Sequence, residues 1–107
     1  MTAVGMLSNM PAKLLFRRRV VLAPGEFAEL VLWRVPHPVK GSAHGYKYRL
    51  AFVADGQCVV RYDNEPGKGD HRHFGEQERS YAFVDVDKLL ADFERDVQRW
   101  RNENSRA

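Results

Sequence analysis

The dipeptide Asp55-Gly56 constrains the fold of this chain more than any other sequence feature, because it lies between two runs of alternating apolar and polar residues. An Asp-Gly pair in that setting is typical of a two-residue type I′ turn. We therefore predict that residues 45–54 form a strand that pairs with the segment directly after the turn.

The same turn predicts the register of this hairpin. With a two-residue connection, Arg49 is expected opposite Tyr62 and Lys47 opposite Asn64. Two cations would then be carried on rigid strands to the point where the hairpin opens. This placement makes both cations candidates for contacting a bound anion.

A second hairpin is predicted nearer the start of the chain. Residues 14–22 and 27–35 are rich in Val, Leu and aromatic residues, and residues 23–26 contain a Pro-Gly turn. A four-residue connection would place Arg18 opposite Val31. These segments add two strands to the predicted sheet.

The C-terminal part of the chain has the pattern of one amphipathic helix. Asp85 is a typical N-cap residue, and Asp87 in the first turn suits the positive end of the helix dipole. Apolar residues recur at helical spacing and predict a stripe that covers a sheet face. The stripe consists of Val86, Leu89, Leu90, Phe93, Val97 and Trp100. The residues expected on the solvent side are Lys88, Asp92, Glu94, Arg95, Asp96 and Arg99.

Together these elements predict an α+β fold with a curved antiparallel sheet of four to five strands, covered by one long C-terminal helix. Residues 81–84 are the candidate for the fifth strand. We expect a single domain over residues 13–103, with a flexible N-terminal tail at 1–12 and a disordered C-terminus at 104–107.

Composition excludes several classes of protein. The chain has 107 residues, of which 44% are hydrophobic and 29% charged, as in an ordinary folded domain. No apolar run approaches the roughly 20 residues of a membrane span, and no secretory signal is evident. The single cysteine, Cys58, excludes an internal disulfide and predicts a small buried residue. We expect a cytoplasmic protein without a cofactor.

Charge is distributed unevenly along the chain. Residues 1–61 carry nine Lys/Arg and three Asp/Glu, whereas residues 62–107 carry eight and eleven. Basic residues thus gather on the strand-rich half, as a phosphate-binding surface requires. The alternative is that these cations merely coat exposed strands.

Residues 62–74 hold the densest group of titratable side chains. We predict that this stretch is a loop between the sheet and the helix, with two histidines at positions i and i+2. A solvated connector without chemistry is the alternative. The notable residues are Asp63, Asn64, Glu65, Gly67, Lys68, Gly69, Asp70, His71, Arg72 and His73.

This stretch also carries a resemblance. Residues 46–50 read Tyr-Lys-Tyr-Arg-Leu, residues 62–65 Tyr-Asp-Asn-Glu and residues 67–73 Gly-Lys-Gly-Asp-His-Arg-His, and a Leu-Leu-Ala-Asp-Phe run follows at 89–93. Together they resemble the TumE family, toxins of prokaryotic type II toxin–antitoxin systems, over about residues 14–100. The resemblance implies a cognate helix-turn-helix DNA-binding antitoxin as partner. A homodimer is left open.

The residues themselves suggest metal-independent cleavage of RNA. Attack of a 2′-hydroxyl on the adjacent phosphate needs a base, an acid and cations for the developing charge. His71 and His73 suit the acid–base roles, because imidazole titrates near neutral pH and the two rings would project to one side, about 7 Å apart along an extended chain. Asp70 is predicted to orient one imidazole. The residues predicted to bind substrate are Lys47, Arg49, Asn64, Lys68 and Arg72.

Two other functions are compatible with the same residues. His71 and His73 with Asp63 or Asp70 would give a magnesium-, manganese- or weak zinc-dependent nuclease. A non-catalytic interaction module would use the basic strands to bind RNA or an acidic antitoxin segment, or would accept a strand at the open sheet edge. His37 and His44 are predicted to be loop residues.

Overall fold

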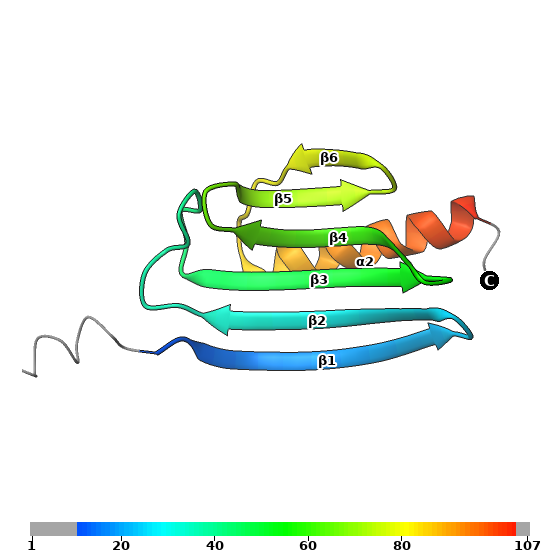
Figure 1. Cartoon of the computed structure of the whole chain (residues 1–107), viewed down its shortest axis with the longest axis horizontal. Helices are drawn as coiled ribbons and strands as arrows, with labels where there is room; N and C mark the ends of the chain where they lie inside the picture. Colours follow the sequence, from blue (N-terminus) through cyan, green and yellow to red (C-terminus); the bar gives the residue numbers. More distant parts are fainter. Residues whose placement is uncertain (1–10, 105–107) are drawn as a thin grey trace, which may run out of the picture.

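The structure, a computed structural model, describes residues 11–104 as one antiparallel sheet with a helix across one face (Figure 1). The strands follow each other in sequence order from β1 to β6. The elements are β1 (Lys13–Ala23), β2 (Glu26–Arg34), β3 (Tyr46–Ala54), β4 (Gln57–Glu65), β5 (Gly69–Phe74), β6 (Gln77–Ser80) and α2 (Val86–Glu103). The predicted α+β architecture is confirmed, but the sheet has six strands, not four or five. Residues 1–10 and 105–107, in the two predicted tails, lie outside the described range.

The strand count differs because residues 62–74 are not a loop. They form the end of β4, a short turn at 66–68 and the whole of β5. The next strand, β6, consists of four exposed polar residues. An edge strand that is exposed on both faces does not need alternating apolar and polar residues. The polar sequence of β6 is therefore indistinguishable from that of a connecting loop. Residues 81–84, the predicted fifth strand, have no regular structure, and Tyr81 and Phe83 instead pack against the core.

Both predicted registers shift by one residue. In the first hairpin only Pro24 and Gly25 connect the strands, and a register shift between Val21 and Ala23 then places Arg18 opposite Leu30 instead of Val31. In the second, the Asp-Gly turn forms as predicted, but a bulge next to Val53 advances the pairing. Beyond this bulge Arg49 lies opposite Asp63, not Tyr62.

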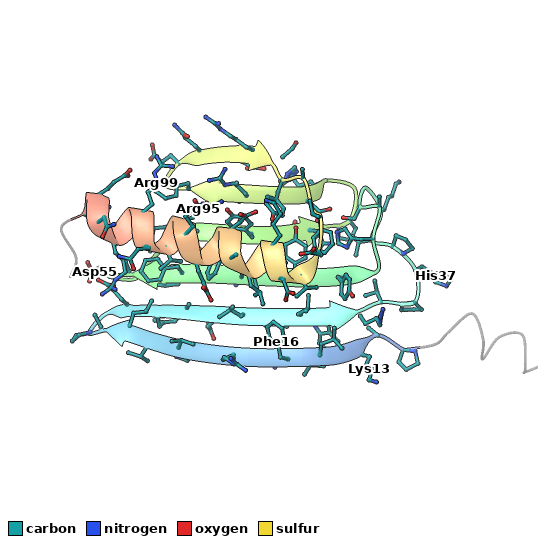
Figure 2. All side chains as sticks on the ribbon, turned by 180° about the vertical axis from the view of Figure 1, so that it is seen from behind. Lys13, Phe16, His37, Asp55, Arg95 and Arg99 are labelled. Carbon is teal, nitrogen blue, oxygen red and sulfur yellow. The ribbon has the colours of Figure 1, made fainter. Side chains whose placement is uncertain are left out.

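The core lies between the sheet and α2, which crosses over β3 and β4 (Figure 2). Asp85 caps the helix as predicted, because its side chain accepts a hydrogen bond of 2.7 Å from the Lys88 amide. The buried apolar residues are Ala28, Leu32, Tyr48, Leu50, Ala51, Phe52, Ala54, Val60, Tyr62, Leu89, Phe93 and Val97. Within residues 11–104, no helix is long and apolar enough to cross a membrane.

Three residues of the chain are buried or exposed contrary to prediction. Asp92 and Asp96 were expected in solvent, but both are buried and serve as acceptors for side chains from the sheet and the 81–84 segment. Cys58 was expected to be buried and is exposed. It lies opposite Val53, which pairs with Phe27 on the face of the sheet away from α2.

Candidate functional site

The face of the sheet opposite α2 collects most of the predicted site. Residues that face each other on neighbouring strands share one side of a sheet, and the register forms two rows across it. One row runs from Arg17 through Arg49 and Asp63 to His71, and the other from Arg19 through Arg61 to His73. We name this surface the open face, because no described element covers it. Its residues are Arg17, Arg19, Glu29, Val31, Lys47, Arg49, Ala51, Arg61, Asp63, His71, His73, Glu78 and Ser80.

His73 is held as a neutral imidazole on this face. The Nη2 of Arg61 donates a 2.9 Å hydrogen bond to Nε2 of His73, so this nitrogen acts as the acceptor. Its Nδ1 lies 3.7 Å from a carboxylate oxygen of Glu78. Burial and the charge of Arg61 together lower the pKa of His73 below its ordinary value. The lowered pKa favours the unprotonated ring, whose Nε2 lone pair is bound to Arg61.

His71 differs from His73 in that its ring nitrogens have no hydrogen-bond partner in the part of the chain that the structure describes. Both of its ring nitrogens are buried, and neither forms a hydrogen bond with any residue from 11 to 104. A buried polar atom without a partner is unfavourable by about 1–3 kcal/mol, so such atoms are uncommon away from functional sites. The two histidines lie on the same side of β5, as the sequence predicted.

Charged side chains surround both histidines in one shallow depression. Its walls are Arg61, Asp63, Glu65, Lys68, His71, His73 and Glu78. Asp63 lies 3.3 Å from the Nε of Arg61, which is aligned too poorly for a hydrogen bond. A second depression, with Arg17, Glu29 and Arg49 among its walls, lies on the same face over β1–β3.

Asp70 is on the opposite face from the histidines that it was predicted to orient. Its carboxylate accepts hydrogen bonds from Tyr48 Oη and Ser42 Oγ, both at 2.6 Å, and from His44 Nε2 at 2.7 Å. The ring of His44 in turn stacks on Phe83, with 3.7 Å between the ring centroids. Asp70 thus orients a histidine, but one that was predicted to be an ordinary loop residue.

Two of the predicted substrate contacts also belong to the helix side. Asn64 is fully buried, and its amide accepts from the Tyr48 backbone at 2.9 Å and donates to the Tyr46 carbonyl at 2.8 Å. Arg72 donates twice to one oxygen of Asp96, at 3.0 and 2.7 Å. Alternation along β4 and β5 separates Asn64, Asp70 and Arg72 from the open face. Lys47, Arg49 and Lys68 remain exposed, with Lys68 at the rim of the histidine depression.

Gly69 was predicted to let the backbone approach a bound anion. The structure gives another reason for glycine at this position. Its φ is +74°, and a Cβ added there would lie 2.6 Å from the carbonyl oxygen of Gly41. The Gly67 amide donates to the Lys40 carbonyl at 2.7 Å in the same contact. These glycines therefore let the loop before β3 pack against the β4–β5 turn.

Sequence reasoning missed Arg17 and Arg61, which contribute two of the cations on the open face. The sequence contains a pattern that could have indicated each of these two residues. Arg61 alternates with Asp63 on a predicted strand, and Arg17 opens a run of three arginines. Only the observed register shows that they share a face with His71 and His73. Among the described residues, no group of three or more His, Cys, Asp or Glu side chains is arranged to hold a metal ion.

A family model described as Toxin TumE matches residues 8–101, which is most of the chain. No curated protein and no solved structure matches it significantly.

Proposed function

The chain belongs to the TumE family of toxins, and on that premise we propose that it acts on RNA as a metal-independent ribonuclease through the open face. Family membership implies a toxin role and suggests an antitoxin partner. The observation that carries the proposal is the pair of histidines on one uncovered sheet face, one with unpartnered ring nitrogens and one held neutral by Arg61.

The two histidines suit different proton transfers. His73 has a lowered pKa and an Nε2 lone pair, so it is the base that takes the proton of a 2′-hydroxyl. In this scheme a phosphate draws the guanidinium of Arg61 away and frees that lone pair. The 2′-oxygen then bonds to phosphorus while the bond to the 5′-oxygen breaks. His71 gives its proton to the departing 5′-oxygen, and the products are a 2′,3′-cyclic phosphate and a 5′-hydroxyl.

The cations of the open face supply the electrostatic part of this mechanism. Charge grows on the phosphate oxygens as the 2′-oxygen attacks, and fixed guanidinium groups stabilise it. Arg61 and Lys68 line the histidine depression, and Arg49 is in the same cross-strand row as His71. Asp63 lies opposite both Arg49 and His71 in the register, and its carboxylate forms an ion pair with Arg61 at 3.3 Å.

The layout favours a single-stranded substrate. The row from Arg17 to His71 crosses four strand spacings, or roughly 19 Å at about 4.8 Å each. A single strand laid across the sheet would meet cations along this distance, and its unstacked bases remain free to contact side chains such as Trp33, which lies opposite Lys47 on the same face. A duplex would present one rigid edge to a shallow depression.

The first test is induction of the protein in a bacterium that lacks the antitoxin. We expect growth arrest and fragmented total RNA from the wild type, and neither from the His71→Ala/His73→Ala double variant. Arg79→Ala is the matched control, because Arg79 lies on β6 opposite Arg72 and faces the helix side. Equal toxicity from a folded double variant would contradict the proposal and favour a toxin that binds without cleaving.

A further inference from the structure

The helix side of the sheet is only partly covered. Figure 2 shows α2 over β3 and β4, while β1 and β2 remain bare beside it. Six strands at about 4.8 Å spacing span roughly 24 Å, whereas one helix covers about 10 Å. Within residues 11–104, no element of comparable width covers β1 and β2.

An apolar groove occupies this place. It runs between α2 and the first hairpin, with a volume of about 310 Å³. Its apolar walls are Val20 and Leu22 from β1, Ala28 and Leu30 from β2, and Phe93 and Val97 from α2. All large apolar residues that are markedly exposed within the described chain, except Val84, are on β1. An exposed apolar strip of this kind is typical of an interaction surface.

The charge on the β1 side of the groove indicates the partner, whereas Glu94 and Arg101 line the α2 side. Arg18 lines it at the middle of β1 and forms no ion pair with any residue that the structure describes. Its neighbours Arg17 and Arg19 point to the open face on the other side of the sheet. We infer that this groove binds an amphipathic helix of a partner protein, with acidic residues along the flank that faces β1. A partner of about 18 residues would match α2 in length, about 27 Å.

A second copy of this chain is a poorer occupant. Antiparallel pairing of two β1 edges would bring the three arginines of one copy against those of the other, and like charges directly opposite are destabilising. Register shifts near both ends of β1 also interrupt its pairing edge. The apolar stripe of α2 is already buried against its own sheet, so it cannot fill a neighbour's groove.

The position of the groove has a consequence for regulation. It lies on the opposite side of the sheet from His71 and His73, so a helix seated there leaves the open face uncovered. Binding of the partner helix and binding of RNA should therefore be independent of each other. The inference does not rest on the ribonuclease proposal.

Two 18-residue helical peptides with one shared apolar stripe test this inference, one with Glu and the other with Lys along the flank. Fluorescence anisotropy should show that the Glu peptide binds the folded protein and that the Lys peptide binds at least about tenfold more weakly. Val20→Asp and Arg18→Glu should each weaken the Glu peptide by about tenfold or more, a change of about 1.4 kcal/mol. Val21→Asp is the matched control, because Val21 is the next residue of β1, is 70% exposed and faces the other side.

Several results would overturn the inference. They are equal binding of the two peptides, binding of neither, or the same loss from Val21→Asp as from Val20→Asp. A wild-type dimer in light scattering that Val20→Asp converts to monomer would assign the groove to a second copy instead. Circular dichroism of every variant checks that the fold is retained, and Arg18→Glu, at an exposed position, removes no apolar contact.

Discussion

The two faces of the β4–β5 pair carry the same kinds of polar residue, but these residues differ in whether they have hydrogen-bond partners. On the helix side Asn64, Asp70 and Arg72 have partners within hydrogen-bonding distance. On the open face both ring nitrogens of His71 lack one, and His73 is held through an arginine that is partly exposed. Alternation along one strand thus separates polar residues that are fully paired on the helix side from a histidine whose buried ring nitrogens have no hydrogen-bond partner among the described residues.

The largest expected difference between the faces concerns stability. Asp70→Ala leaves three donors, on the buried Tyr48 and the partly buried Ser42 and His44, without their acceptor, so we expect a loss of about 3 kcal/mol or more. Chemical denaturation measures the free energy of unfolding. His71→Ala, one position along β5, should change it by less than about 1 kcal/mol. Similar losses from both variants would contradict the division into two faces.

A second expected effect concerns the glycines beside this network. Gly69→Ala should destabilise the fold by about 2 kcal/mol or more, because it combines a positive φ with a Cβ 2.6 Å from the Gly41 carbonyl. Gly67→Ala has a similar positive φ but open space around its Cβ, so a smaller loss of about 1 kcal/mol is expected. Thermal unfolding of the two variants, compared with the wild type, separates the steric contact from the backbone conformation.

A smaller effect is expected at the tyrosine under α2. Tyr62→Phe removes a 2.6 Å hydrogen bond to Asp96 but leaves Arg72 bound to that carboxylate, so we expect a loss of about 1 kcal/mol. Tyr46→Phe is the control, because its hydroxyl makes no hydrogen bond within residues 11–104. An unchanged denaturation midpoint in Tyr62→Phe would show that the buried hydroxyl adds nothing to stability.

The smallest effect is a pH dependence from His73. Its pKa is lowered in the fold by burial and by Arg61, so the unfolded chain binds the proton more readily. The stability that this neutral ring contributes is present above the ordinary histidine pKa of about 6.5 and is lost as pH falls through the lower folded value. In His73→Gln the free energy of unfolding should decrease less between about pH 7 and 5 than in the wild type. NMR titration of the His73 ring checks the direction directly.

The sequence predicted the fold class because its strongest signals are local. The Asp55-Gly56 turn, the Asp85 cap and the apolar stripe of α2 each depend on residues within a few positions. β6 escaped prediction because a four-residue polar edge strand has no pattern of its own. β6 forms because β5 offers it a pairing edge, and the residues of β6 alone do not predict this pairing.

The candidate site was predicted only in part, for a related reason. The spacing of His71 and His73 placed both on one side of β5, and that geometry is found. The side to which Asp70 and Arg72 point depends on treating residues 62–74 as strands instead of a loop. The residue opposite Arg49 on β4 depends on a β-bulge, and no residue near Val53 has a sequence signal that predicts this bulge.

The most direct test of the account is the rate at which purified protein cleaves a single-stranded RNA, with a chelator present. We expect His71→Gln and His73→Gln each to lower the rate by at least about a hundredfold, and Arg61→Ala by about tenfold or more. Arg79→Ala on the helix side should leave it unchanged. Equal rates in wild type and both histidine variants, or loss from Arg79→Ala alone, would contradict the claim that the open face carries the chemistry.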